Sequence, residues 1–151
     1  MQIVYHLFCG SGEEVIGLSH SGWRGTVGKI GKVTVEKMEE EFGCDPADIL
    51  GAVGPSICQD CYEVSEDVIK KFRENYDENL WPEIFYQKEN GKYQLNLWKA
   101  NESVFLESGI LPEHIAVTNV CTHCNPGYFC SHTETTGNER GTLSAFLALK
   151  K

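Results

Sequence analysis

One short stretch of the sequence combines an imidazole, a guanidinium and several glycines. Residues 19–26 read Ser-His-Ser-Gly-Trp-Arg-Gly-Thr, and they join an apolar, strand-like run to a helix-like pattern. Gly22 and Gly25 leave room for a tight turn and close backbone approach, so His20 is displayed where backbone amides also converge. Arg24 adds a planar five-donor fork that suits a phosphate or a carboxylate. The stretch therefore predicts an anion site beside a histidine, and a strand-end histidine that merely bonds the backbone is the alternative.

Two Cys-x-x-Cys pairs form a second group of reactive side chains, Cys58 with Cys61 and Cys121 with Cys124. Four thiolates held tetrahedrally make a structural zinc site. Some 60 positions separate Cys61 from Cys121, however, which is much longer than the spacing in zinc ribbons. Neither pair lies between a strand and a helix as a thioredoxin-like redox motif requires. We therefore expect ordinary reduced cysteines rather than one closed four-cysteine site.

The overall composition limits the classes of partner. The chain has 151 residues and a formal net charge of −9, which argues against a nucleic-acid-binding face. No apolar run approaches the roughly 18 to 20 residues of a membrane helix, and the N-terminus lacks the features of a signal peptide. The seven cysteines are an odd number in a chain longer than small disulfide scaffolds. We therefore expect a cytoplasmic protein with reduced thiols and no membrane partner.

Four stretches follow one another in the order found in a single protein family. Besides residues 19–26, they are Gly54–Ile57 with Cys61–Val64, Leu97–Asn101, and Cys121–Thr122 with Asn125 and Phe129–His132. Together they resemble the motifs of the laccase-domain family, also called polyphenol oxidase or peptidoglycan editing factor proteins. The family's members are similar to zinc enzymes that act on purine nucleosides. The resemblance implies phosphorolysis of adenosine, inosine or methylthioadenosine, with purine nucleoside and phosphate as substrates, and adenosine deamination as a further activity.

The resemblance also implies roles for individual side chains. The family's metal site resembles two histidines and one cysteine, and only His20 has a counterpart here, so His20 is the implied zinc ligand. Arg24 and the neighbouring amides would hold phosphate or ribose oxygens. Cys121, His123 and His132 are candidates for acid–base or supporting groups. The roles of the other cysteines of the two pairs stay open, and Arg140 is a further candidate for an anion contact.

Copper is the less favoured metal. A multicopper oxidase needs a blue site of two histidines and a cysteine together with a separate histidine-rich cluster. The five histidines of this chain cannot supply both: His6, His20, His114, His123 and His132. A nucleoside site asks for one open metal position, an anion pocket and an apolar slot, for which Trp23, Tyr128 and Phe129 offer stacking surfaces.

Two other functions remain as alternatives at this point. On the same scaffold, a hydrolase could edit peptidoglycan precursors that carry the wrong amino acid. A non-enzymatic remnant could keep only a structural metal site made of the four paired cysteines. Turnover of nucleosides distinguishes the first reading from both alternatives.

The pattern of apolar residues predicts a mixed α/β or α+β fold, a layered sandwich of mixed β-sheet with about three helices packed outside. We expect one domain over residues 1–151 that lacks the N-terminal portion of the family, with an exposed sheet edge that favours a homo-oligomer. The expected helices cover residues 27–42, a segment after Ser65, and residues 97–108. The expected strands cover residues 2–8, 13–19, 49–53, 84–89, 92–95, 115–120, 128–131 and 142–149.

Local signals fix several element boundaries. Asp45, Ser65 and Asn96 stand where helix N-caps are expected, and Gly43 stands where a left-handed cap is expected. Asn90-Gly91 is the strongest hairpin signal. On the helix over residues 97–108, Asn101 shares the apolar face, which favours a core asparagine with satisfied hydrogen bonds.

Overall fold

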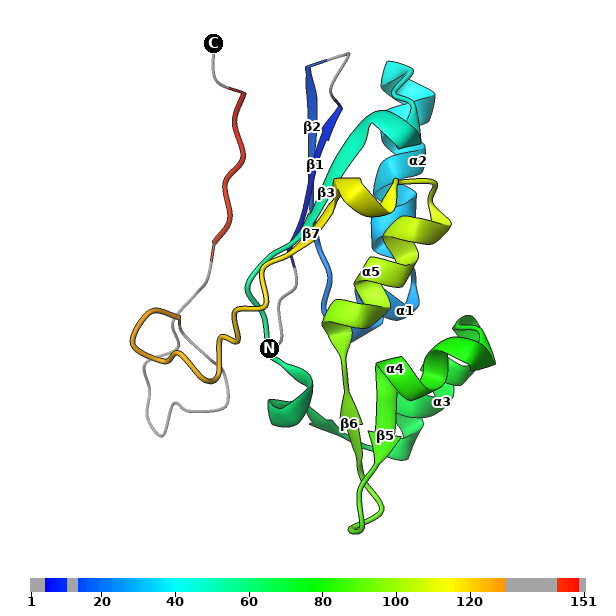
Figure 1. Cartoon of the computed structure of the whole chain (residues 1–151), viewed down its shortest axis with the longest axis vertical. Coiled ribbons are helices and arrows are strands. Elements are labelled where there is room, and N and C mark those ends of the chain that lie inside the picture. The colour runs from blue at the N-terminus through cyan, green and yellow to red at the C-terminus, as the bar shows by residue number, and fades with distance from the viewer. Residues whose placement is uncertain (1–4, 11–13, 130–143, 150–151) are drawn as a thin grey trace.

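The computed structural model describes residues 5–10, 14–129 and 144–149, with the backbone alone described for 5–10. A four-stranded mixed sheet forms one half of the molecule (Figure 1). Its strands, in spatial order, are β2 (Val15–His20), β1 (Tyr5–Gly10), β3 (Ile49–Val53) and β7 (Ile115–Val117). Strand β1 is antiparallel to both β2 and β3, and β3 is parallel to β7. Strands β2, β3 and β7 therefore run in the same direction, and their carboxyl ends lie at one end of the sheet.

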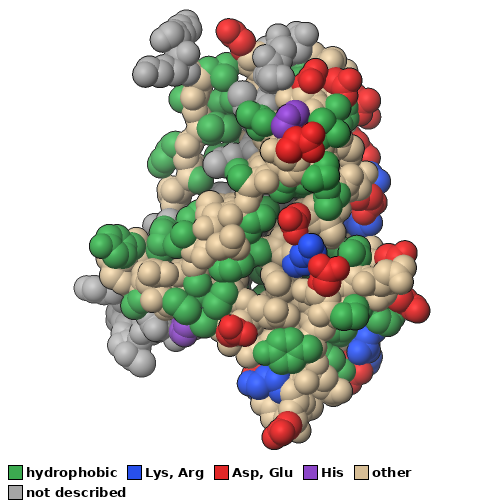
Figure 2. All heavy atoms as spheres, viewed as in Figure 1, with side chains coloured by type: hydrophobic (Ala, Val, Ile, Leu, Met, Phe, Trp, Pro, Cys, Tyr) green, Lys and Arg blue, Asp and Glu red, His purple; other side chains and the backbone are tan. Residues whose placement is uncertain are grey.

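Helices α2 (Ile30–Phe42) and α5 (Leu97–Glu107) cover one face of this sheet (Figure 1). The alternation along β3 decides which face is covered, because Ile49 and Val53 are fully buried whereas Leu50 is exposed. The opposite face of β3, to which Leu50 belongs, is thus more open to solvent. Glu39–Glu41, near the end of α2, are exposed. Figure 2 shows acidic side chains along the side of the molecule on which Figure 1 places α2.

A second, antiparallel sheet of three short strands forms the other half. Its strands, in spatial order, are β4 (Glu63–Val64), β6 (Tyr93–Leu95) and β5 (Phe85–Gln87), packed with α3 (Glu66–Asn75) and α4 (Trp81–Ile84). The predicted hairpin is confirmed, since β5 pairs with β6 and Gly91 takes the positive φ of 78° that a tight turn needs. The expected mixed α/β class is confirmed, with α2, α3 and α5 as the three long helices.

The helix expected over residues 27–42 is interrupted. A short helix α1 (Trp23–Val27) comes first, and α2 begins only at Ile30. Lys29, with a left-handed φ of 52°, separates the two helices and changes the direction of the chain. Its ammonium group donates to the Glu107 carboxylate at 2.6 Å, which fixes the bend against α5. The end of α2 is as predicted, because Gly43 caps it with φ 69°.

Two of the predicted caps form with the expected side chains. The Asp45 carboxylate accepts the Ala47 N–H at 2.9 Å, and the Asn96 amide oxygen accepts the Lys99 N–H at 3.0 Å. Ser65 precedes α3 as expected, but its hydroxyl makes no capping hydrogen bond. Sequence signals thus locate these helix starts even where the cap itself differs.

Two of the predicted strands near the C-terminus are not found in the described residues. Residues 144–149 form no strand, and Tyr128 and Phe129 lie in a turn and bend. Strand β7 ends at Val117, three residues before the predicted end. The rest of the strands predicted over residues 128–131 and 142–149 lies outside the described residues. Apolar residues alone did not identify strands here, because a strand also needs a neighbour to accept its backbone hydrogen bonds.

Within the described part of the chain, no helix is both long and apolar enough to cross a membrane.

Candidate functional site

Three loops meet the carboxyl end of the four-stranded sheet. The 19–26 stretch runs from the end of β2 into α1, the 54–61 loop follows β3, and the 118–124 segment follows β7. The last two continue side by side beyond the strands, because Ser56 and Cys121 form an isolated parallel bridge. Ligands of open α/β sheets bind outside the carboxyl ends of the strands. This end of the sheet is therefore the candidate functional site.

The turn after β2 is compact because glycine permits a close backbone contact. A Cβ atom at Gly25 would lie 3.3 Å from the His20 carbonyl oxygen, tighter than most such contacts. Gly22 caps α1, and its carbonyl oxygen accepts both the N–H of Thr26 at 2.8 Å and the Thr26 hydroxyl at 2.9 Å. His20 is the last residue of β2 and Arg24 the second residue of α1, and both are exposed. The 19–26 stretch thus carries an imidazole and a guanidinium four residues apart on a backbone fixed by its own hydrogen bonds.

A buried hydrogen-bond network anchors the turn to the helices behind it. The hydroxyls of Ser21 and Thr26 lie 2.9 Å apart, and the Asn101 amide contacts both, each at 3.1 Å. The Asn101 amide also donates to the Leu97 carbonyl at 2.8 Å, and the Tyr76 hydroxyl donates to the Thr26 carbonyl at 2.7 Å. Asn101 is only 1% exposed, so the expectation of a satisfied core asparagine is confirmed.

Arg24 contacts the aromatic side chain that precedes it in the sequence. Its guanidinium carbon is 4.4 Å from the centroid of the Trp23 ring, within cation–π range. Burial raises the pKa of Tyr62 to about 12, and the positive charge of Arg24 opposes that shift. Tyr62 directly follows the 54–61 loop, so the charge of Arg24 acts on a side chain next to the loop after β3.

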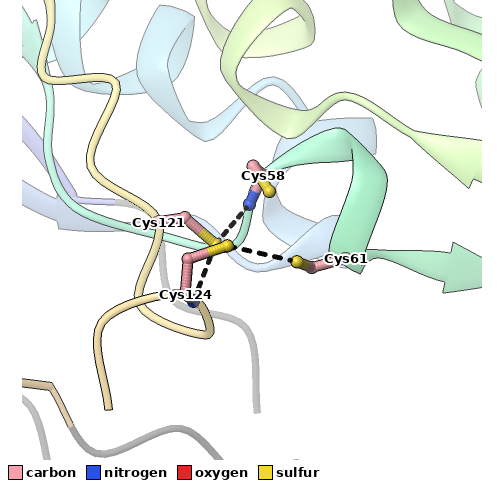
Figure 3. Close-up of side chains that lie close together, drawn as sticks. All are labelled: Cys58, Cys61, Cys121 and Cys124. Atoms are coloured by element: carbon pink, nitrogen blue, oxygen red, sulfur yellow. Dashed lines mark hydrogen bonds between the residues drawn. The ribbon is translucent and has the colours of Figure 1, made fainter. Parts of the chain in front are cut away.

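The four paired cysteines lie together (Figure 3). Their Sγ atoms all lie within 4.8 Å of one another, and those of Cys61 and Cys124 are 3.5 Å apart. The Cys121 Sγ accepts the backbone N–H of Cys58 at 3.3 Å and that of Cys124 at 3.4 Å. The expectation that the pairs do not form one site is therefore wrong. The parallel pairing of β3 with β7 closes the gap of some 60 positions.

The thiols of this cluster differ in acidity. Burial raises the pKa of Cys121. Hydrogen bonds from the backbone N–H groups and side chains of Cys58 and Cys124 lower it by more, so the net pKa is about 7. Burial raises the pKa of the Cys61 thiol, and hydrogen bonds to Cys124 and Cys58 add to that shift. Cys121 therefore ionises more readily than Cys61.

The structure separates the predicted site residues into two groups. His20 ends β2 and Arg24 lies in α1, whereas Cys121 lies inside the cysteine cluster and His123 is half-buried in the turn that carries Cys124. His132 and Arg140 lie outside the described residues. The sequence analysis assigned no role to Ser21, Thr26 and Tyr62, although all three lie in the stretches that carry the family resemblance.

The zinc implied at His20 lacks a matching set of ligands in this part of the chain. Among the described residues, the four cysteines are the only group of three or more histidine, cysteine or carboxylate side chains that could hold one ion. A catalytic zinc ion takes three protein ligands. Such an ion at His20 would therefore draw its other ligands from outside the described residues.

Comparison with known proteins agrees with these features. The family model for multi-copper polyphenol oxidoreductase laccase matches residues 4–150. The purine nucleoside phosphorylase YlmD of Bacillus subtilis is 33% identical over 140 residues, which are 92% of this chain and 49% of that protein. The adenosine deaminase RL5 of an unknown prokaryotic organism is 37% identical over 117 residues, which are 78% of this chain and 44% of that protein.

A solved structure supports the same relationship. The crystal structure of YlmD from Geobacillus stearothermophilus superposes with a TM-score of 0.81 at 33% identity, covering 87% of this chain and 48% of that one. The chain spans about half the length of the curated relatives it matches. With a family match over nearly its whole length and relatives above 30% identity, this chain belongs to the multi-copper polyphenol oxidoreductase laccase family.

Proposed function

We propose that this chain acts as a purine nucleoside phosphorylase, with purine nucleoside and phosphate as its substrates. The purine nucleoside phosphorylase of Bacillus subtilis, 33% identical over 92% of this chain, supports the reaction class. The observation that carries the proposal is that His20 and Arg24 are both exposed, four residues apart, on the stretch at the carboxyl end of β2 that the Asn101 network anchors. Phosphate attacks the anomeric carbon, the bond from that carbon to the purine nitrogen breaks, and ribose 1-phosphate and free base result.

Arg24 is the proposed phosphate contact. Its guanidinium is planar, permanently charged and held over the Trp23 ring, so its donors are oriented before an anion arrives. Helix α1 has only five residues, and its dipole is correspondingly short. The anion contact in this proposal therefore depends on the guanidinium more than on the helix amides.

His123 is the proposed acid that protonates the departing purine. Of the three acid–base candidates from the sequence, Cys121 is surrounded by the other three cysteines and His132 lies outside the described residues. His123 is half-buried in the turn after β7, at the same end of the sheet as Arg24. An imidazole is the side chain best suited to proton transfer near neutral pH.

The proposal is tested by phosphorolysis of adenosine, inosine and methylthioadenosine by the full chain. In Arg24→Met, we expect the KM for phosphate to rise by roughly tenfold to a hundredfold, because one charge-assisted contact is lost. In His20→Ala, we expect turnover to disappear. Lys37→Met, on the exposed side of α2, is the control and keeps wild-type kinetics. An unchanged phosphate KM in Arg24→Met would contradict the role of the guanidinium.

Adenosine deamination is the second candidate, because a relative at 37% identity is an adenosine deaminase. In this reaction, water adds at the amino-bearing purine carbon and ammonia leaves. Inosine formation in phosphate-free buffer measures it separately from phosphorolysis. If all nucleosides are inert while a peptidoglycan precursor with the wrong amino acid is cleaved, the editing hydrolase replaces both candidates.

A homo-oligomer through the edge of the larger sheet is also proposed. Strand β2 is at the edge of the sheet, and within the described residues β1 is its one neighbouring strand. Leu18 on this strand is 43% exposed. An edge strand with apolar residues offers backbone groups and side chains to a second chain.

A further inference from the structure

The four cysteines have the geometry of a single metal ion's ligand shell. Four thiolates at about 2.3 Å from one zinc ion form a tetrahedron with edges of about 3.8 Å. In the cluster, Cys61 and Cys124 are 3.5 Å apart, and no pair of Sγ atoms is separated by more than 4.8 Å. These limits lie on either side of the ideal edge. An iron–sulfur cluster would place iron and sulfide between the thiolates and so needs them farther apart.

The surrounding backbone favours thiolates over thiols at this place. Two backbone N–H groups, from Cys58 and Cys124, point at the Cys121 Sγ. Hydrogen bonds of this kind stabilise the negative charge of a metal-bound sulfur. Without a metal, four sulfur atoms packed within reach of one another gain little, because a thiol is a weak donor and a weak acceptor.

We propose that Cys58, Cys61, Cys121 and Cys124 bind one zinc ion in a closed structural site. Four protein ligands leave no open coordination position, so the ion is not the catalytic one. Its role follows from the chain segments it joins, the loop after β3 and the turn after β7. The zinc ion would therefore hold these two segments of the candidate site together.

Metal analysis of the full chain, purified under reducing conditions, tests the proposal without any nucleoside. We expect about one zinc ion per chain in the wild type and close to none in Cys61→Ser or Cys124→Ser. Cys44→Ala is the matched control, because Cys44 is a buried cysteine outside the cluster, and it keeps the zinc ion. Since this readout involves no turnover, it can fail while the proposed phosphorylase activity stands, and the reverse is equally distinguishable.

Cobalt substitution of the wild-type chain keeps the test valid if the serine variants fold poorly. We expect the visible absorption of tetrahedral cobalt bound to four thiolates, displaced by one equivalent of zinc. Folded, reduced wild-type protein that takes up neither metal would overturn the proposal. So would a Cys61–Cys124 disulfide found by mass spectrometry, equal zinc loss in Cys44→Ala, or bound iron in place of zinc.

Hydrogen exchange then tests the structural role. On removal of zinc, we expect faster amide exchange in residues 54–64 and 118–125, while α2, on the helical face of the sheet, exchanges as before. Unchanged exchange in both loops would contradict a structural site.

Discussion

At the scale of single residues, the position of the functional turn depends on Asn101. This side chain is almost fully buried and bonds two hydroxyls and one carbonyl, so it ties the turn after β2 to α5. A buried amide with satisfied hydrogen bonds fixes one arrangement, because alternatives leave donors unpaired. Asn101 is therefore a positioning residue for His20 and Arg24, and it has no direct role in the chemistry.

Asn101→Ala tests this role. The substitution leaves the hydroxyls of Ser21 and Thr26 without their amide partner, and we expect a loss of about 1–3 kcal/mol in the free energy of unfolding. Urea denaturation measures it. Ser103→Ala, which removes a hydroxyl bonded within the same helix, is the control and should cost less. Equal losses in both variants would show that the network has no special weight.

Glu63 gives the chain a pH-dependent contact. Hydrogen bonds from Lys88, Lys92 and Asn90 lower the pKa of this carboxyl to about 2. Because this pKa is lower in the folded protein than in the unfolded chain, the ionised carboxylate stabilises the fold at pH values above the ordinary glutamate pKa. This stabilisation is lost as the pH falls toward 2.

We therefore expect Glu63→Gln to lower the thermal midpoint at neutral pH, and the difference from wild type to shrink as the pH is lowered below the ordinary glutamate pKa. Thermal unfolding at a series of pH values measures the difference, and NMR titration of the Glu63 carboxyl measures the pKa directly. A carboxyl that titrates at the ordinary glutamate value would contradict the ion-pair interpretation.

At the scale of elements, the packing of α5 on β3 requires a glycine. A Cβ atom at Gly51 would lie 3.0 Å from the Phe105 ring and 3.4 Å from Ile110. Phe105 and Ile110 are among the most buried side chains, so neither can move aside without disturbing the core. Gly51 therefore sets how closely this helix approaches the sheet.

Gly51→Ala should destabilise the fold by about 1–3 kcal/mol through overpacking, measured as a lower urea midpoint with an unchanged slope. Gly127→Ala is the control, because a Cβ atom there meets nothing within 4 Å. If both alanine variants are as stable as wild type, the helix and strand are packed less tightly than the distances indicate.

At the scale of the whole molecule, the open edge at β2 is the place where a second chain would pair. We expect concentration-dependent self-association in analytical ultracentrifugation, and Leu18→Lys should weaken it because a charge on an edge strand opposes pairing. Leu106→Lys on α5 is the control, since Leu106 is 42% exposed and Leu18 is 43% exposed. A monomer at all concentrations, or equal effects of the two variants, would contradict association through this edge.

Local sequence signals were sufficient for much of the fold. Local signals predicted the caps at Asp45 and Asn96, the left-handed cap at Gly43 and the hairpin at Gly91. Each of these features depends only on residues close to it in the chain. The break at Lys29 was missed because it is fixed by a distant partner, Glu107. The missing strand at residues 144–149 has the same cause, since pairing depends on neighbours that a local pattern does not show.

The candidate site divides in the same way. The sequence by itself determined the turn with His20 and Arg24, because its glycines and its two chemical groups lie within eight residues. Only the tertiary structure decided that the two cysteine pairs meet. Their contact depends on β3 and β7 lying side by side as parallel strands. The residues of one strand do not show which other strand it will pair with. Sequence separation therefore argued against a contact that the sheet topology creates.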